Sequence, residues 1–317
     1  MTKLAAIDCG TNSIRLLISD ISSGSPQELH REMRIVRLGQ GVDATGDIDP
    51  QALERTRLAL AEYLELMKQE NVSAVRMVAT SAMRDASNRN EFFAMTAELL
   101  GQITPGAQAE IISGEEEAQL SFQGAVADLP PEDGPFCVID LGGGSTEFVV
   151  GEHDGGLKAA HSIQVGCVRV TERIMRTDPP TDMEQEIARE YVDERLQRVE
   201  LLVPLDQART FVGCAGTFTT LSALAQGLES YDPALIHCSS LQFDALKVLV
   251  RDLIAENAAQ RRKHPVVHPG RADVLGAGAL IVSRIVAMIQ RLSSVDHFVV
   301  SEKDILDGII QGLMSKT

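Results

Sequence analysis

The hydrophobic pattern of the chain contains one motif twice. Residues 6–19, AIDCGTNSIRLLIS, align without a gap with residues 138–151, VIDLGGGSTEFVVG. In each segment an apolar run ends at an aspartate, a polar turn with glycine follows, and a second apolar run begins. This pattern predicts a β-hairpin with a tight turn. Because a repeat indicates internal duplication, we expect two similar halves that each open with a hairpin.

Strand and helix patterns alternate after each predicted hairpin. In the first half we expect strands at 74–80 and 109–113, and helices from Asp49-Pro50, near 87–100 and from about 115. In the second half we expect strands at 157–164, 210–214 and 297–300, and helices near 166–176, 183–202, 217–226, 241–256, 272–291 and 303–315. The Pro-rich acidic segment 128–135 predicts a linker. The pattern therefore predicts an α/β protein with domains at 1–127 and 128–302, and a site in the cleft between them.

Composition narrows the class of protein. A chain of 317 residues with 44% hydrophobic residues can form two cores, and its net charge of −16 disfavours a nucleic-acid platform. Five scattered cysteines indicate neither a disulfide framework nor a zinc site. The longest apolar stretch is interrupted by Arg284, so we expect a buried helix there. With no signal-peptide pattern at the N-terminus, we expect a cytoplasmic protein with no nucleic-acid or membrane partner.

The two predicted turns could bind phosphate. Consecutive backbone N–H groups without obstructing side chains are a common way to hold phosphate oxygens, although glycines can also serve the turn alone. Two turns in register, each after an acid, favour phosphate binding. The candidate residues are Gly10, Thr11, Asn12, Ser13, Gly142, Gly143, Gly144 and Ser145.

Acidic residues flank these turns. Asp8 and Asp140 end the first strand of each hairpin, where a buried acid needs a cation or N–H donors. Beside phosphate the natural cation is Mg²⁺, which accepts a few carboxylates together with water and phosphate oxygens. Glu147 lies where the first copy has Arg15, and it is either a third metal-associated acid or a solvated strand residue.

Further segments carry residues suited to phosphate chemistry. Arg84, in TSAMRDASN, could bind phosphate with both guanidinium nitrogens or pair with Asp85. The segment IISGEEEAQL starts a helix with Glu115, Glu116 and Glu117. One of these acids could position and deprotonate a water molecule. All three suit the first turn of a helix, so the helix dipole does not distinguish among them.

Two more segments leave a functional and a structural interpretation open. Gly216 and Thr217 follow another predicted strand and could contact phosphate, or Thr217 could cap a helix. The basic segment RRKHPVVHPGRAD at 261–273 could guide a polyanion or be a solvated loop.

Five ordered motifs, AIDCGTNSIRLLISD, TSAMRDASNRNEF, ISGEEEAQLSF, VIDLGGGSTEFVVG and VGCAGTFTTLSAL, resemble those of the Ppx/GppA phosphatases of the actin-like ATPase superfamily. The resemblance runs from residue 4 to about 300. It implies two ribonuclease-H-like domains around a cleft, with the final helix packed on the first domain. It also implies Glu116 as catalytic base, Arg84 as phosphate-binding arginine and the turn residues as donors. Asp140 and Glu147 would bind Mg²⁺, with Mn²⁺ as a substitute, and a homodimer is implied.

The resemblance predicts an exopolyphosphatase that removes the terminal phosphate of inorganic polyphosphate. The chain stops near residue 317, and Asp307 stands where many relatives have arginine. Longer family members have extra C-terminal helical domains that help to hold long polyphosphate. Both this difference and Asp307 lead us to expect short polyphosphate chains as substrate. The alternatives are a guanosine pentaphosphate 5′-phosphohydrolase, an ATP-dependent kinase and a non-catalytic polyphosphate or nucleotide sensor.

Overall fold

The computed structural model describes residues 2–316, which form two compact units. Unit 1 runs to Leu120 and also includes the segment from Ile305 onward, and unit 2 comprises Ser121–Asp304. The division falls within helix α5 (Gly114–Ala125), a few residues before the predicted boundary at 127/128. The predicted linker 128–135 lies in unit 2, where it contains the short 3₁₀ helix η1 (Pro131–Asp133).

Unit 1 contains a five-stranded mixed sheet in the order β3-β2-β1-β4-β5. Its strands are β1 (Lys3–Cys9), β2 (Ser13–Asp20), β3 (Gln27–Ile35), β4 (Ala74–Ala79) and β5 (Ala109–Ile111). The predicted hairpin is present, with β1 and β2 antiparallel, whereas β4 and β5 continue the sheet in parallel. The edge strand β3 extends the hairpin and was not predicted from the sequence.

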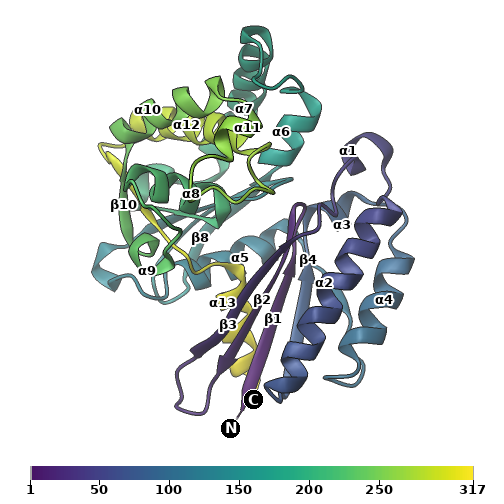
Figure 1. The fold of residues 1–317 in the computed structure, drawn as a ribbon. Coiled ribbons are helices and arrows are strands. Elements are labelled where there is room, and N and C mark those ends of the chain that lie inside the picture. Colours follow the sequence, from purple (N-terminus) through teal and green to yellow (C-terminus); the bar gives the residue numbers. More distant parts are fainter. Residues whose placement is uncertain (1, 317) are drawn as a thin grey trace. The chain divides into compact units, whose positions relative to one another are not determined.

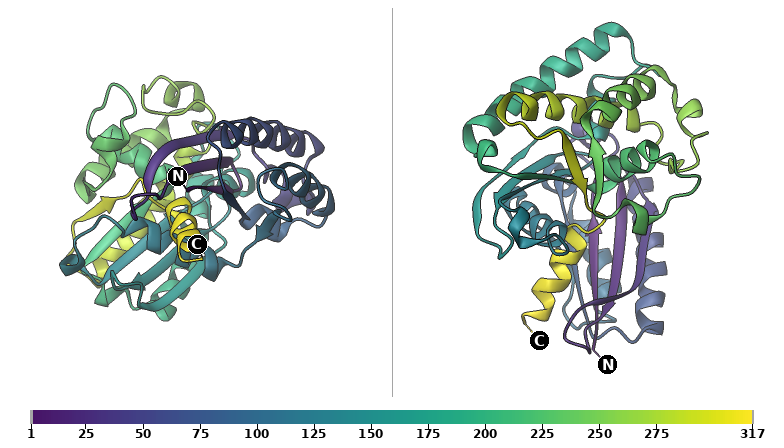
Figure 2. Two further views of the ribbon diagram at one scale, coloured as in Figure 1. Left: turned by 90° about the horizontal axis from the view of Figure 1, so that it is seen from below. Right: turned by 90° about the vertical axis from the view of Figure 1, so that its left-hand side faces the viewer.

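Helices cover both faces of this sheet (Figures 1 and 2). Helices α2 (Pro50–Gln69) and α4 (Asn90–Leu100) pack on the face to which β1 contributes Ala5 and Ile7. Helix α13 (Ile305–Met314) packs on the opposite face, against Leu4 and Ala6. Because β1 is buried on both faces, it reads as a continuous apolar run rather than an alternating one. The short helices α1 (Val42–Thr45) and α3 (Ser81–Asp85) complete unit 1.

Unit 2 contains a six-stranded mixed sheet in the order β10-β11-β9-β6-β7-β8. Its strands are β6 (Phe136–Leu141), β7 (Thr146–Gly151), β8 (Leu157–Ile163), β9 (Thr210–Cys214), β10 (Ser239–Gln242) and β11 (His297–Val300). Antiparallel β8-β7-β6 followed by parallel β9 and β11 repeats the arrangement of unit 1. The prediction of an α/β fold with two related mixed sheets is therefore confirmed, while β10 was not expected.

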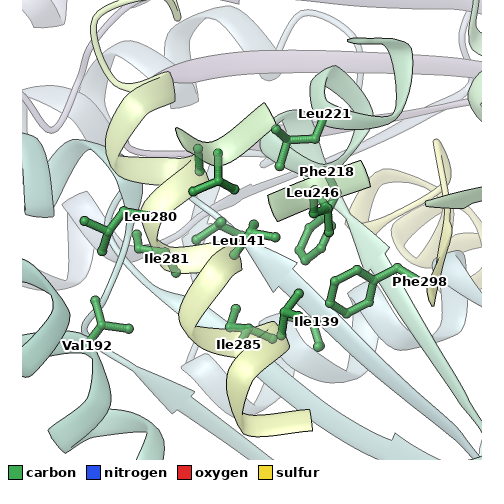
Figure 3. Packing of buried hydrophobic residues seen from close by; sticks show 14 of the residues in the cluster. Ile139, Leu141, Val192, Phe218, Leu221, Leu246, Leu280, Ile281, Ile285 and Phe298 are labelled. Atoms are coloured by element: carbon green, nitrogen blue, oxygen red, sulfur yellow. The ribbon is translucent and has the colours of Figure 1, made fainter. Parts of the chain in front are cut away.

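The core of unit 2 lies between its sheet and helix α12 (Leu275–Leu292). Figure 3 shows Ile285 of α12 near Ile139 of β6, and Ile281 of α12 near Leu141 of β6. Among the residues described, α12 alone is long and apolar enough to cross a membrane, but 67% of it is buried in the protein, as predicted for a core helix. The remaining helical segments are α6 (Cys167–Arg173), α7 (Asp182–Leu202), η2 (Leu205–Gln207), α8 (Ala215–Ala225), α9 (Pro233–Ile236), α10 (Phe243–Ala255) and α11 (Ala258–Arg261).

Candidate active site

The glycine-rich turn of unit 2 is held by the start of α6. Backbone N–H groups of α6 donate to the carbonyls of Gly142 and Gly143 at 2.9–3.1 Å. Arg169 Nε donates to the Gly144 carbonyl at 2.8 Å. A Cβ on Gly166 would lie 2.3 Å from the Gly143 oxygen, so only glycine permits this close approach. All three glycine carbonyls are thus bound on one side of the turn.

The amides of this turn remain available. In the part of the chain that the structure describes, the N–H groups of Gly143, Gly144 and Ser145 donate to no other residue. The Gly142 N–H is used instead to close the hairpin, donating to the Ser145 carbonyl at 3.0 Å. Because unpaired consecutive N–H groups favour an anion, the turn can cradle phosphate oxygens.

The turn of unit 1 is built in the same way. The Gly10 N–H closes the hairpin by donating to the Ser13 carbonyl at 3.0 Å. The Asn12 carbonyl accepts from the N–H groups of residues 36 and 37 at 3.1 and 2.8 Å, and the Thr11 carbonyl accepts from residue 39 at 2.9 Å. Over the described residues, the N–H groups of Thr11 and Asn12 have no internal partner. The supporting segment 36–39 was missed because it carries no recognisable motif.

The two hairpins differ in the residues opposite their aspartates. In unit 1, Asp8 lies opposite Arg15, whose Nη2 and Nε contact Asp8 Oδ2 at 2.6 and 3.1 Å. In unit 2, Asp140 lies opposite Glu147. The structure therefore gives Asp8 a guanidinium partner where a metal was expected. Asp140 instead faces a second carboxylate, and directly opposed like charges destabilise a sheet unless a cation balances them.

The carboxylate pair of unit 2 has a donor set that fits Mg²⁺. Asp140 and Glu147 are 7% and 1% exposed, which excludes the solvated-strand interpretation of Glu147. Ser121 Oγ donates to Asp140 Oδ2 at 2.6 Å, and Ser162 Oγ donates to Glu147 Oε1 at 2.8 Å. The described residues contain no group of three or more histidine, cysteine or acidic residues suited to a metal. Mg²⁺ is commonly held by one or two carboxylates with water and phosphate oxygens, so two acids suffice.

In unit 1 a half-buried arginine lies against an acid of α5. Arg84 Nη1 donates to Glu117 Oε2 at 2.7 Å and to the Ile112 carbonyl at 3.1 Å. Arg84 Nη2 is buried and has no hydrogen-bond partner among the described residues. The alternative pairing of Arg84 with Asp85 does not appear in the described contacts. A buried guanidinium nitrogen without an acceptor is suited to an oxyanion.

The three glutamates at the start of α5 have different surroundings. Glu115 is exposed, and Glu116 Oε1 accepts from Arg76 Nη2 at 2.7 Å. Glu117 is buried, with 9% of its surface exposed, beside Arg84. The structure thus brings together Arg84 and Glu117, whereas the resemblance pointed to Glu116. These acids are neighbours in sequence, so only the rotation of α5 about its axis decides which of them lies beside Arg84.

Gly216 is covered by an arginine that sequence reasoning did not select. A Cβ on Gly216 would lie 1.0 Å from Arg271 Nη1, so the guanidinium of Arg271 lies directly on this glycine. Thr217 does not cap α8, because the cap position is Cys214 and no side chain bonds there. The signal for Arg271 was its place in the basic segment 261–273.

The rest of the basic segment has a structural role. Arg261 is 2% exposed and donates to the backbone carbonyls of Leu253, Glu256 and Ala272 at 2.6–2.8 Å. His264 Nε2 contacts the Glu256 carboxylate at 2.9 Å. These bonds tie the segment to the C-terminal end of α10.

The cysteines near the two turns are not poised as nucleophiles. Burial, followed by the negative charge of Asp8, raises the pKa of the Cys9 thiol well above its ordinary value. Burial raises the pKa of Cys167 to about 11, against the opposing effect of Arg271. Since the thiolate is the nucleophilic form, both residues act as packing groups at neutral pH.

Known proteins with similar sequences and structures were compared with the chain. A model of the Ppx/GppA phosphatase family matches residues 17–315. Exopolyphosphatase 2 of Mycobacterium tuberculosis is 52% identical over 317 residues, covering 99% of each protein. The crystal structure of an exopolyphosphatase-like protein has a TM-score of 0.92 at 38% identity, covering 99% of both chains. A Ppx/GppA family member from Aquifex aeolicus has a TM-score of 0.80 at 30% identity, covering 99% of this chain and 98% of that chain.

Proposed function

Because the chain belongs to the Ppx/GppA phosphatase family, we propose that it is an exopolyphosphatase that hydrolyses the terminal phosphoanhydride bond of inorganic polyphosphate. The observation that carries this proposal is the part-buried contact of 2.7 Å between Arg84 and Glu117. Glu117 offers a carboxylate that can bind water, and Arg84 Nη2, which has no hydrogen-bond partner among the described residues, can bind phosphate. A relative named exopolyphosphatase, 52% identical over nearly the whole length of both chains, supports the same activity.

Glu117 acts as the base in this proposal. Its carboxylate orients a water molecule and accepts a proton as that water attacks the terminal phosphorus. Arg84 binds the terminal phosphate and balances negative charge that grows in the transition state. We favour Glu117 over Glu116 because Glu117 contacts Arg84, whereas Glu116 is paired with Arg76 and its side chain is 44% exposed.

The turn amides and the carboxylate pair serve binding. The N–H groups of Gly143, Gly144 and Ser145 in unit 2, and those of Thr11 and Asn12 in unit 1, donate to phosphate oxygens. Mg²⁺ held by Asp140 and Glu147 would supply positive charge to the phosphates, with Mn²⁺ as a substitute. That one cleft between the units collects these groups remains a prediction from the sequence, as do a cytoplasmic location and a homodimer.

The proposal is tested by phosphate release from polyphosphates of graded length, with guanosine pentaphosphate and ATP as comparators. We expect the highest kcat/KM on polyphosphate, and the graded lengths show which chain length is preferred. Higher kcat/KM on guanosine pentaphosphate would favour the alternative within the family. Tight polyphosphate binding without release would make the protein a sensor, and phosphorylation of an acceptor by ATP would make it a kinase.

The preference for short chains no longer draws support from Asp307. In the structure, Arg31 Nη2 donates to both Asp307 oxygens at 2.9 and 3.1 Å, joining β3 to α13. Asp307 is therefore explained by packing within unit 1. The length series decides the preference independently of this residue.

A further inference from the structure

We propose that Ser121 is a positioning residue for the metal site: its hydroxyl orients Asp140 so that the opposed carboxylates bind one divalent cation. This inference rests on the proposed role of Asp140 and Glu147 in the phosphohydrolase. Ser121 is fully buried, with 0% of its surface exposed, and its Oγ lies 2.6 Å from Asp140 Oδ2. The sequence reasoning did not select it.

The comparison of the two hairpins shows why the pair needs an orienting group. In unit 1 the two nitrogens of Arg15 fix Asp8 and balance its charge. In unit 2 the residue opposite Asp140 is Glu147, which cannot donate a hydrogen bond when ionised. Ser121 and Ser162 supply the donors from outside the hairpin, one to each carboxylate.

The position of Ser121 is fixed by its neighbours on α5. The next residue, Phe122, is fully buried and packs so closely on β7 that a Cβ on Gly151 would lie 2.8 Å from its ring. A hydroxyl has one proton to donate, and here Asp140 receives it. The side chain of Ser121 therefore binds Asp140 through Oδ2. Residues that orient metal ligands in this way typically change metal affinity when they are replaced.

Metal binding to the free enzyme tests this inference. Mn²⁺ affinity is measured by electron paramagnetic resonance without polyphosphate, on the wild type, S121A and S222A. Ser222 is the matched control because it is 1% exposed and its Oγ lies 2.7 Å from Ser239 Oγ, in a part-buried hydroxyl contact that does not involve the carboxylates. We expect S121A to weaken Mn²⁺ binding about 10- to 100-fold and S222A to leave it unchanged.

A second variant covers the case in which S121A does not fold. S162A removes the donor to Glu147 and is expected to weaken Mn²⁺ binding as well. Folded S121A with wild-type Mn²⁺ affinity, an equal loss in S222A, or a wild type that binds no Mn²⁺ would overturn the inference. If S121A does not fold, unchanged affinity in S162A would overturn it. Because no substrate is present, failure of the exopolyphosphatase proposal would appear separately, in the phosphate-release assay.

Discussion

Replacement of Glu117 by Gln should abolish most of the turnover while the protein stays folded. Gln has the same shape and keeps a carbonyl oxygen that can accept from Arg84, whose Nη1 lies 2.7 Å from Glu117. The change removes the negative charge, and with it the ability to take a proton from water. It therefore isolates the proposed chemical role of this side chain.

The expected size of the loss follows from that role. A positioned general base contributes about 10²- to 10⁴-fold to the rate. This corresponds to roughly 3–5 kcal/mol in the activation free energy. Glu116 provides the comparison, because it accepts from Arg76 and its side chain is 44% exposed. Screened by solvent, such a pair contributes about 0–1 kcal/mol to stability, so E116Q should stay folded. Because Glu116 pairs with Arg76 and not with Arg84, its replacement should leave kcat close to that of the wild type.

The assay is steady-state release of phosphate from a short polyphosphate by the wild type, E117Q and E116Q. Circular dichroism shows whether each variant is folded. We expect kcat to fall for E117Q with KM little changed, and both constants to persist in E116Q. The reasoning is refuted if E116Q loses its turnover while E117Q retains it, which would restore the residue that the family resemblance suggested.

Three further predictions concern stability and thiol reactivity. D307N should lower the free energy of unfolding by about 1–3 kcal/mol in urea denaturation, because Arg31 loses a charged acceptor. The control is E54Q, which removes the charge from the exposed ion pair of Glu54 with Arg57 and should leave the free energy of unfolding near that of the wild type. Hydrogen bonds from Thr177 and Thr181 lower the pKa of Glu184 to about 2, so the stability that ionised Glu184 contributes is present above its ordinary pKa near 4.5 and is lost as pH falls toward 2. E184Q should therefore reduce the change of melting temperature with pH between about 4.5 and 2, and an unchanged slope would contradict this. Cys238 is the exposed thiol among five, so a thiol reagent should label one cysteine in the native protein and all five after denaturation; rapid native labelling of several would show that the buried cores open readily.

Much of the fold could be predicted because the strands carry their own signal. β1 and β6 are buried on both faces and their hairpins repeat in register. β3 escaped because its sequence QELHREMRI is mostly polar, as suits an edge strand that is largely exposed or half-buried. The corresponding edge strand of unit 2, β8, was predicted because LKAAHSI alternates apolar and polar residues.

For the site, the sequence indicates suitable residue types more clearly than it indicates individual positions. Asp140, Glu147 and Arg84 are all buried or half-buried in surroundings suited to phosphate or metal. The choice between Glu116 and Glu117 depends on the rotation of α5 relative to β4 and β5. Adjacent helical positions differ by about 100° in direction, and only tertiary packing fixes that angle.

Residues that act by supporting others gave little sequence signal. Ser121 and Arg169 look like ordinary helix residues, and their importance appears only through the atoms they contact, Asp140 Oδ2 and the Gly144 carbonyl. Arg271 was noticed only as part of a basic segment. These side chains differ from their sequence neighbours in their contacts with residues distant in the chain, which the sequence alone does not show.

The packing of α13 on β1 has a consequence for synthesis on the ribosome. The core on this side of unit 1 joins Leu4 and Ala6 to Ile305 and Ile309, which are translated only after the whole of unit 2. Unit 2 is continuous in sequence and can fold as it emerges, whereas the sheet of unit 1 lacks α13 until that helix has been made. We therefore expect unit 2 to complete its fold first, the reverse of the usual N-terminal-first order. Until Ile305–Met314 leaves the exit tunnel, the nascent chain presents an apolar sheet face that a chaperone can bind.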